Sequence, residues 1–104
     1  MGYEEKHFQR AVELKLKKNN VIFKSQVEIK LPYEEGTIGK FYADLIIGEG
    51  DKRILLELKK SKFITLNNIR QAHRYLKVMG IKLAIIVNFG RKGGLQYKRI
   101  INLK

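Results

Sequence analysis

The sequence contains no cysteine, no tryptophan, a single proline and no long apolar run. Without cysteine, the chain can form neither disulfides nor catalytic or zinc sites built on thiolates. No segment approaches the roughly 20 apolar residues that a membrane-spanning helix needs, and the N-terminus lacks the apolar centre of a signal peptide. These absences predict a cytoplasmic protein with no membrane contact.

Acidic residues are scarce in one half of the chain. Residues 1–51 carry eight Lys/Arg and nine Asp/Glu, whereas residues 52–104 carry fourteen Lys/Arg and one acid, Glu57, within a total net charge of +12. A strongly basic surface attracts polyanions, and nucleic acid is the polyanion expected for a cytoplasmic domain. The alternative is that the lysines serve solubility alone.

The length and composition predict one domain spanning residues 1–104. A chain of 104 residues can bury one modest core but not two. With 44% hydrophobic residues, it is not expected to be disordered.

Two apolar segments around a polar, glycine-containing turn predict an antiparallel hairpin. Residues 42–47 and 53–59 form the strands, and residues 48–51 the turn. This register places Asp44 opposite Glu57 and puts Lys59 on the same face, with opposed Cβ atoms about 5 Å apart. Facing carboxylates are destabilising unless a cation lies between them, and Mg²⁺ or Mn²⁺ prefers such oxygen ligands. The alternative is an ordinary solvated sheet face.

The remaining pattern predicts a mixed sheet with a helix on each side. The expected order is helix, three antiparallel strands, helix, parallel strand and a final edge strand. The core stripe expected for the second helix is Leu66, Ile69, Ala72, Leu76 and Met79. The ranges expected for these elements are 3–18, 21–31, 38–47, 53–59, 65–79, 83–87 and 95–103, with a turn over 32–36.

This order, with Asp44 followed by the Glu57-Leu58-Lys59 segment, resembles the PD-(D/E)XK nuclease superfamily and its restriction-endonuclease-like αβββαβ core. Within the superfamily it is most similar to the small GxxExxY proteins. Phe8 replaces the tyrosine of their signature, and Ala43 replaces the proline that names the superfamily. The segments that carry the resemblance are residues 2–8, 41–45, 56–59 and 87–90.

The resemblance implies a site with defined roles. Asp44 and Glu57 would bind the metal together with the backbone carbonyl of Leu58, and Lys59 would be catalytic. By the same analogy, Glu5 would complete the metal site, although the helix dipole alone favours an acid in a first helical turn. Gln71 and Tyr75 match a Gln-xxx-Tyr pattern, in which Gln71 would lie near the metal or hold the substrate phosphate; without the analogy they would be a polar contact on a helix.

Basic residues flank this predicted site and would neutralise phosphates without reading sequence. Arg70 and Arg74 lie at helical spacing, which a solvated helix face explains equally well. Arg91 and Lys92 lie in a glycine-rich loop that is either a DNA backbone contact or a simple hairpin turn. The full set of predicted nucleic-acid contacts is Lys60, Lys62, Arg70, Arg74, Tyr75, Arg91 and Lys92.

The predicted function is metal-dependent hydrolysis of phosphodiester bonds in DNA, selective for structure rather than sequence. A homodimer is compatible with this function, because a two-fold pair can cut two strands. Two alternatives stay open: a module on the same fold that binds nucleic acid without cleaving it, and an accessory subunit that docks an acidic protein.

Overall fold

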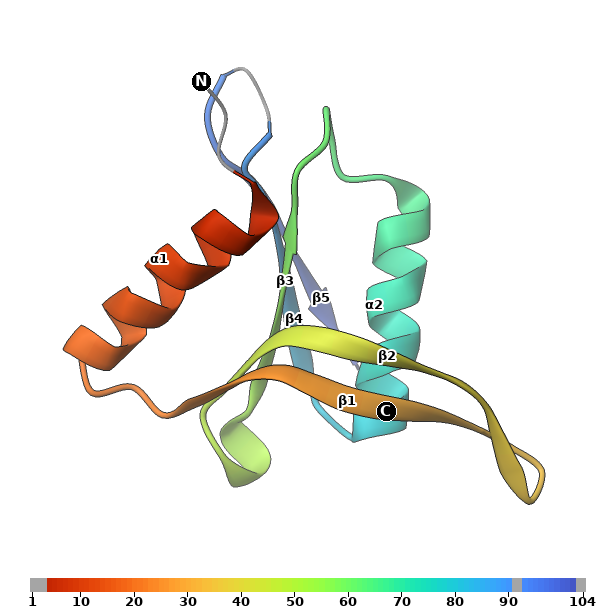
Figure 1. The fold of residues 1–104 in the computed structure, drawn as a ribbon. Coiled ribbons are helices and arrows are strands. Elements are labelled where there is room, and N and C mark those ends of the chain that lie inside the picture. The colour runs from red at the N-terminus through yellow and green to blue at the C-terminus, as the bar shows by residue number, and fades with distance from the viewer. Residues whose placement is uncertain (1–3, 91–92, 103–104) are drawn as a thin grey trace.

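The computed structural model describes residues 4–90 and 93–102, which form a five-stranded mixed sheet with one helix against each face (Figure 1). No helix in these ranges is long and apolar enough to cross a bilayer. The elements are α1 (Glu5–Lys18), β1 (Phe23–Tyr33), β2 (Gly36–Ile47), a short 3₁₀ turn (Gly50–Lys52), β3 (Ile54–Lys59), α2 (Leu66–Met79), β4 (Leu83–Asn88) and β5 (Gln96–Ile101).

The strands lie in sequence order across the sheet, from β1 at one edge to β5 at the other. Neighbouring pairs are antiparallel except β3 and β4, which are parallel and joined through α2. This topology confirms the predicted αβββαβ order and the predicted edge strand at the end of the chain. The expected end of the last strand at residue 103 and the expected start of the first helix at residue 3 both lie outside the described residues.

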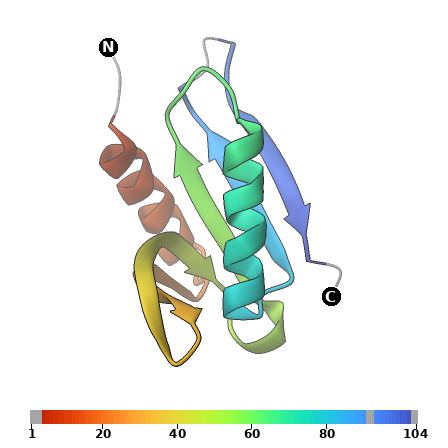
Figure 2. The same ribbon diagram turned by 90° about the vertical axis from the view of Figure 1, so that its right-hand side faces the viewer.

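Two apolar clusters fill the two sides of the sheet. The larger lies between the sheet and α2, which crosses in front of β3, β4 and β5 in Figure 2. The smaller lies under α1 and is built on Leu45, Leu56 and Leu58, with Phe8 and Val12 of the helix packed against them. Because side chains alternate along β3, its two faces serve different clusters: Leu55 faces α2, whereas Leu56 and Leu58 face α1.

The α2 helix has a well-defined beginning and end. The side chain of Thr65 accepts a hydrogen bond from the Asn68 N–H, and Gly80 ends the helix at a φ of 69°. Within the predicted core stripe, the prediction for Leu66 is wrong: this first residue of α2 is 59% exposed. Tyr75 is buried instead and stacks on Phe41.

The hairpin of β1 and β2 projects from the rest of the molecule (Figure 1). The predicted turn over residues 32–36 is too long, since the pairing continues to Tyr33 and Gly36. Pro32 lies inside β1 at a register shift. It is tolerated there because β1 is an edge strand, where a missing N–H need not cost a ladder hydrogen bond.

Candidate active site

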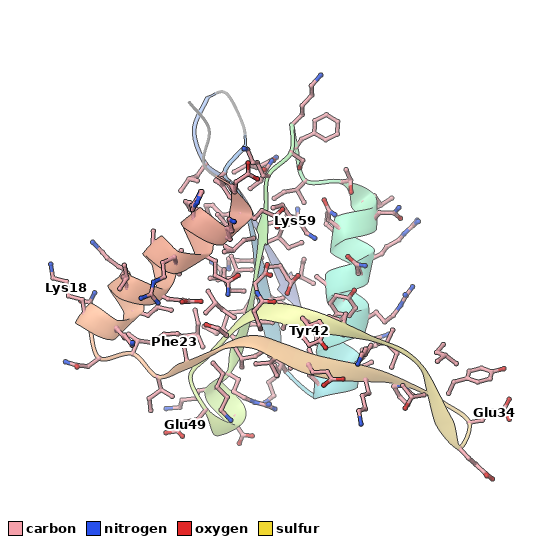
Figure 3. All side chains as sticks on the ribbon, in the orientation of Figure 1. Lys18, Phe23, Glu34, Tyr42, Glu49 and Lys59 are labelled. Carbon is pink, nitrogen blue, oxygen red and sulfur yellow. The ribbon has the colours of Figure 1, made fainter. Side chains whose placement is uncertain are left out.

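The predicted site lies at the carboxyl end of β3, where Lys59 points into the region between the two helices (Figure 3). Both α1 and α2 begin at this end of the sheet (Figure 1). Alternation along β3 places Glu57 and Lys59 on the same face as Leu55, toward α2. Glu57 is only 7% exposed, and Lys59 is half-buried.

Asp44 and Glu57 are held together by two hydrogen bonds that replace the strand ladder. Regular pairing of β2 with β3 covers Leu45–Ile47 and Ile54–Leu56 and then stops. Beyond it, the Asp44 N–H donates to Glu57 Oε2 at 3.3 Å, and the Leu58 N–H donates to Asp44 Oδ2 at 2.7 Å. The structure therefore brings the two predicted carboxylates together in the register that the sequence predicted.

An irregularity in β1 explains why Asp44 leaves the ladder. Gln26, which would pair with Asp44, has a φ of 50° and is absent from the register, while the residues on both sides remain paired. A side-chain-bearing residue at positive φ is strained and needs support from its surroundings. The Gln26 amide finds that support in Gln9 Oε1 at 2.8 Å and Asp44 Oδ1 at 3.4 Å.

Side chains of α1 complete the support of Asp44. Gln9 Nε2 donates to the Asp44 carbonyl oxygen at 3.0 Å and to Glu13 Oε2 at 3.0 Å. Glu13 Oε2 also accepts from Ser25 Oγ at 2.7 Å, and this hydrogen bond is the main reason that the pKa of Glu13 is lowered. Both main-chain groups of Asp44 thus bond to side chains, one from α1 and one from β3.

Burial and the neighbouring carboxylate set the charge of Glu57. Burial raises its pKa, the Asp44 carboxylate raises it further, and the result is about 7. The Asp44 N–H and the Lys59 ammonium oppose the shift but do not cancel it. Burial and then the charge of Glu57 also raise the pKa of Tyr75. A positive charge beside Glu57 would therefore favour its ionised form.

The α2 residues named from sequence are split between the surface and the core. The Tyr75 ring is buried against Phe41, so its predicted role as a nucleic-acid contact is corrected: the ring fills the core. Gln71, one turn earlier, is exposed and lines an open polar cleft with Arg70 and Arg74. The structure places Gln71 at the surface beside these cations, with no hydrogen bond to Asp44 or Glu57.

The loop that follows Lys59 carries the exposed side chains of Lys60 and Lys62. Lys60 shares an open cleft with Glu5 at the start of α1. Glu5 is exposed, and its charge contributes the smallest of the effects that raise the pKa of Glu57. Arg91 and Lys92 lie outside the described residues.

A sequence model of the PD-(D/E)XK nuclease superfamily matches residues 1–100. The chain belongs to the PD-(D/E)XK nuclease superfamily. A search of curated proteins found no match. Among solved structures, the crystal structure of SSO0001 is similar, with a TM-score of 0.74 and 22% sequence identity over 93% of this chain. The match covers 50% of SSO0001, so this chain spans half its length, and at this identity the likeness shows the fold alone.

PD-(D/E)XK nucleases typically use divalent metals, and the donor atoms here fit such an ion. The Asp44 and Glu57 carboxylates lie side by side, and the Leu58 carbonyl points to the same strand edge as its N–H, which bonds Asp44. Two carboxylates and a carbonyl are hard oxygen ligands of the kind that Mg²⁺ combines with water. In the described ranges, no three acidic or histidine side chains gather, so Glu5 is not part of a three-acid cluster.

Sequence reasoning missed the polar residues that surround Asp44 and the loop after Lys59. The missed residues are Gln9, Glu13, Ser25 and Gln26 around Asp44, and Asn88 and Gln96 beneath the loop after Lys59. Only Asn88 had a usable signal, as a polar residue directly after the apolar segment 83–87. Glutamines and serine on exposed positions look like ordinary surface residues until the strand irregularity is seen.

Proposed function

We propose that this protein is a Mg²⁺- or Mn²⁺-dependent nuclease that hydrolyses phosphodiester bonds in DNA in the cytoplasm, selecting DNA by structure rather than sequence. The observation that carries the proposal is the pairing of partly buried Asp44 with buried Glu57 beyond the end of the β2 and β3 ladder. The Asp44 N–H donates to the Glu57 carboxylate at 3.3 Å, and the Asp44 carboxylate accepts from the Leu58 N–H at 2.7 Å. Two adjacent carboxylates lower the free energy of unfolding of the metal-free protein. A function that requires a bound cation explains why both are retained.

Each residue of the site has a proposed role. The carboxylates of Asp44 and Glu57 and the carbonyl of Leu58 hold the ion, which when bound lowers the pKa of water and polarises the scissile phosphate. Lys59, whose ammonium is close enough to lower the pKa of Glu57, stabilises negative charge that develops on the phosphate. Glu5, proposed from the resemblance to complete the metal site, adds negative charge near Glu57, whose pKa it helps to raise. Gln71 orients a phosphate from the α2 surface.

The basic surface around the site supports DNA as the substrate. Lys60 and Lys62 follow Lys59 directly, and the cleft along α2 is lined by Arg70 and Arg74 with no acid. Contacts of this kind bind the backbone of any sequence. Selectivity would then depend on the shape of the DNA, such as an end, a flap or a branch. Arg91 and Lys92 stay predicted contacts to the DNA backbone, and a homodimer would allow paired cuts.

The test is cleavage of labelled single-stranded, duplex, flapped and four-way-junction DNA, in Mg²⁺, in Mn²⁺ and in chelator. We expect metal-dependent cutting that Asp44→Asn and Lys59→Ala each reduce by at least about a hundredfold, as loss of a directly acting group does. Asp51→Asn and Lys52→Ala are matched controls, because both residues are exposed at the opposite end of β3.

One result would replace the proposal with its alternative. If the protein binds DNA in a salt-dependent manner but cuts none of these substrates with either metal, it is a binding module on a nuclease fold. Cutting that persists unchanged in both site variants would show that the reaction occurs elsewhere.

A further inference from the structure

The loop between β3 and α2 presents a phenylalanine to solvent. Phe63 is 59% exposed, whereas Phe8, Phe23, Phe41 and Phe89 are all partly buried against one of the two apolar clusters. The next residue, Ile64, packs against the larger apolar cluster, whereas the Phe63 ring does not. All five phenylalanines lie in the described residues, and Phe63 is the one that is exposed.

The main chain on both sides of Phe63 is fixed by β4 and β5. The Ser61 N–H donates to Asn88 Oδ1 at 3.0 Å, and the Ile64 N–H donates to Gln96 Oε1 at 3.0 Å. Ser61 Oγ donates to the carbonyl of Phe63 at 3.1 Å. Asn88 is fully buried. These bonds hold the loop in one conformation, so the ring needs little further ordering to bind a flat partner.

The position and charge of the loop indicate what that partner is. Phe63 lies four residues after Lys59 and has Lys60 and Lys62 as near neighbours, and no acid follows Glu57 in the sequence. Cations that bind phosphates beside an exposed aromatic ring form the combination that binds single strands, in which bases stack on the ring. A base inside a duplex has both faces covered by its neighbours and cannot stack in this way.

We propose that Phe63 is a stacking platform for an unpaired nucleobase of a strand that enters the site beside Lys59. This inference rests on the proposed nuclease function and narrows its substrate to DNA with a single-stranded segment, such as a flap, a frayed end or a free strand. Lys60 and Lys62 bind the phosphates on either side of the stacked base.

The absence of tryptophan from the chain allows a direct test of stacking. A Phe63→Trp variant carries one tryptophan, whose fluorescence is quenched when a base stacks on the indole. The probe is a single-stranded oligothymidylate of about ten nucleotides, a length in the range that one binding groove covers. Titration in chelator prevents cleavage. We expect saturable quenching by the single strand and little quenching by a blunt duplex at equal phosphate concentration.

Affinity measurements on substituted proteins provide the second readout. By fluorescence anisotropy in chelator, we expect Phe63→Ala to weaken binding of the single strand about tenfold, as loss of one base stack does, and to leave duplex binding nearly unchanged. Leu66→Ala is a matched control because Leu66 has the same 59% exposure, and Tyr97→Ala is an aromatic control at 66% exposure on β5. Both controls should bind the single strand as the wild type does.

The outcomes separate this inference from the proposed function. Absence of quenching, or equal loss of single-strand and duplex binding in Phe63→Ala, would overturn the stacking proposal even if the wild type cleaves DNA. Quenching with the expected loss in Phe63→Ala would support it even if no metal gives cleavage, in which case the nuclease proposal alone would fail.

Discussion

The buried Glu57 carboxylate lies beside the Asp44 carboxylate. Burial, and then the charge of Asp44, raise the pKa of Glu57 from 4.5 to about 7. Its folded-state pKa lies above its unfolded-state value, so the folded protein binds more protons between these two pH values. Without metal, the free energy of unfolding therefore falls as pH rises from about 4.5 to about 7. The residue that serves the site destabilises the metal-free fold at neutral pH.

The fall in the free energy of unfolding with rising pH gives a prediction for Glu57→Gln. In chelator at pH 8, we expect the variant to have a higher free energy of unfolding than the wild type by about 3 kcal/mol at most, since the amide avoids a buried charge. Urea denaturation from pH 4 to pH 8 measures the difference, which should shrink toward pH 4. Glu49→Gln, at an exposed position before the 3₁₀ turn, is the control and should show no such trend. A difference between Glu57→Gln and wild type that is constant with pH would contradict the pKa shift.

At the scale of the elements, the loop after β3 is in close contact with the segment after β4, which is distant in sequence. The Phe89 N–H donates to the Lys59 carbonyl at 3.0 Å, and Gly90 packs directly against the loop backbone. A Cβ at position 90 would lie 2.7 Å from the Ser61 nitrogen and 2.9 Å from the Ser61 oxygen. Because backbone atoms cannot turn aside as a side chain can, the loop and the segment after β4 fit only with glycine there.

We therefore expect Gly90→Ala to lower the free energy of unfolding by about 1–3 kcal/mol, as overpacking does. The displaced loop should also bind single-stranded DNA more weakly, because Lys60 and Phe63 move with it. Gly93→Ala is the matched control, since nothing lies within 4 Å of the added Cβ and the residue is exposed. Urea denaturation of the two variants side by side makes the measurement. Equal stability of the two would show that the loop can shift without cost.

The elements themselves were largely predictable from sequence. Alternation and apolar periodicity predicted the helices, the strands, their order and the parallel pairing of β3 with β4, and the hairpin register placed Asp44 beside Glu57. The errors arose where long-range packing decides the outcome. Pro32 continues a strand because that strand is an edge, and Tyr75 rather than Leu66 is buried because of where α2 crosses the sheet.

The supporting part of the site was not predictable, and the reason is physical. Gln26 acquires its role only through a positive φ, and Gln9 only because α1 packs over that point of the hairpin. Neither property has a signature in local composition or spacing. The acids could be predicted because a lone carboxylate among apolar strand residues is unusual in itself, whereas a glutamine on a helix surface is common.

At the scale of the whole molecule, the position of Asp44 depends on three separate segments. Its carbonyl oxygen accepts a hydrogen bond from the Gln9 side chain of α1, and its carboxylate accepts one from the Leu58 N–H of β3. The carboxylate also accepts a longer hydrogen bond from the Gln26 side chain of β1. Loss of a group that holds a metal ligand in place typically weakens metal binding by about 10- to 100-fold. Side chains that never touch the ion should therefore change how tightly it binds.

For Gln9→Ala, we expect Mn²⁺ affinity to fall by about tenfold or more and the metal-free protein to lose about 1 kcal/mol of stability. The rise in Tm with Mn²⁺ concentration measures the affinity without any need for cleavage. Lys17→Ala, which changes an exposed residue near the end of the same helix, should leave the metal titration unchanged. Identical titrations of both variants would show that the α1 contact has no part in positioning Asp44.

The main chain of Asp44 forms hydrogen bonds with side chains instead of with a neighbouring strand, and this has a consequence for folding. Gln9 and Asp44 are 35 residues apart, and Asp44 and Leu58 are 14 apart, so neither bond can form within one local element. Contacts between distant residues form only after the chain has closed the intervening loops. A partly folded chain therefore contains both carboxylates but does not hold them in the arrangement that could bind a metal ion. We expect metal binding to require the completed fold.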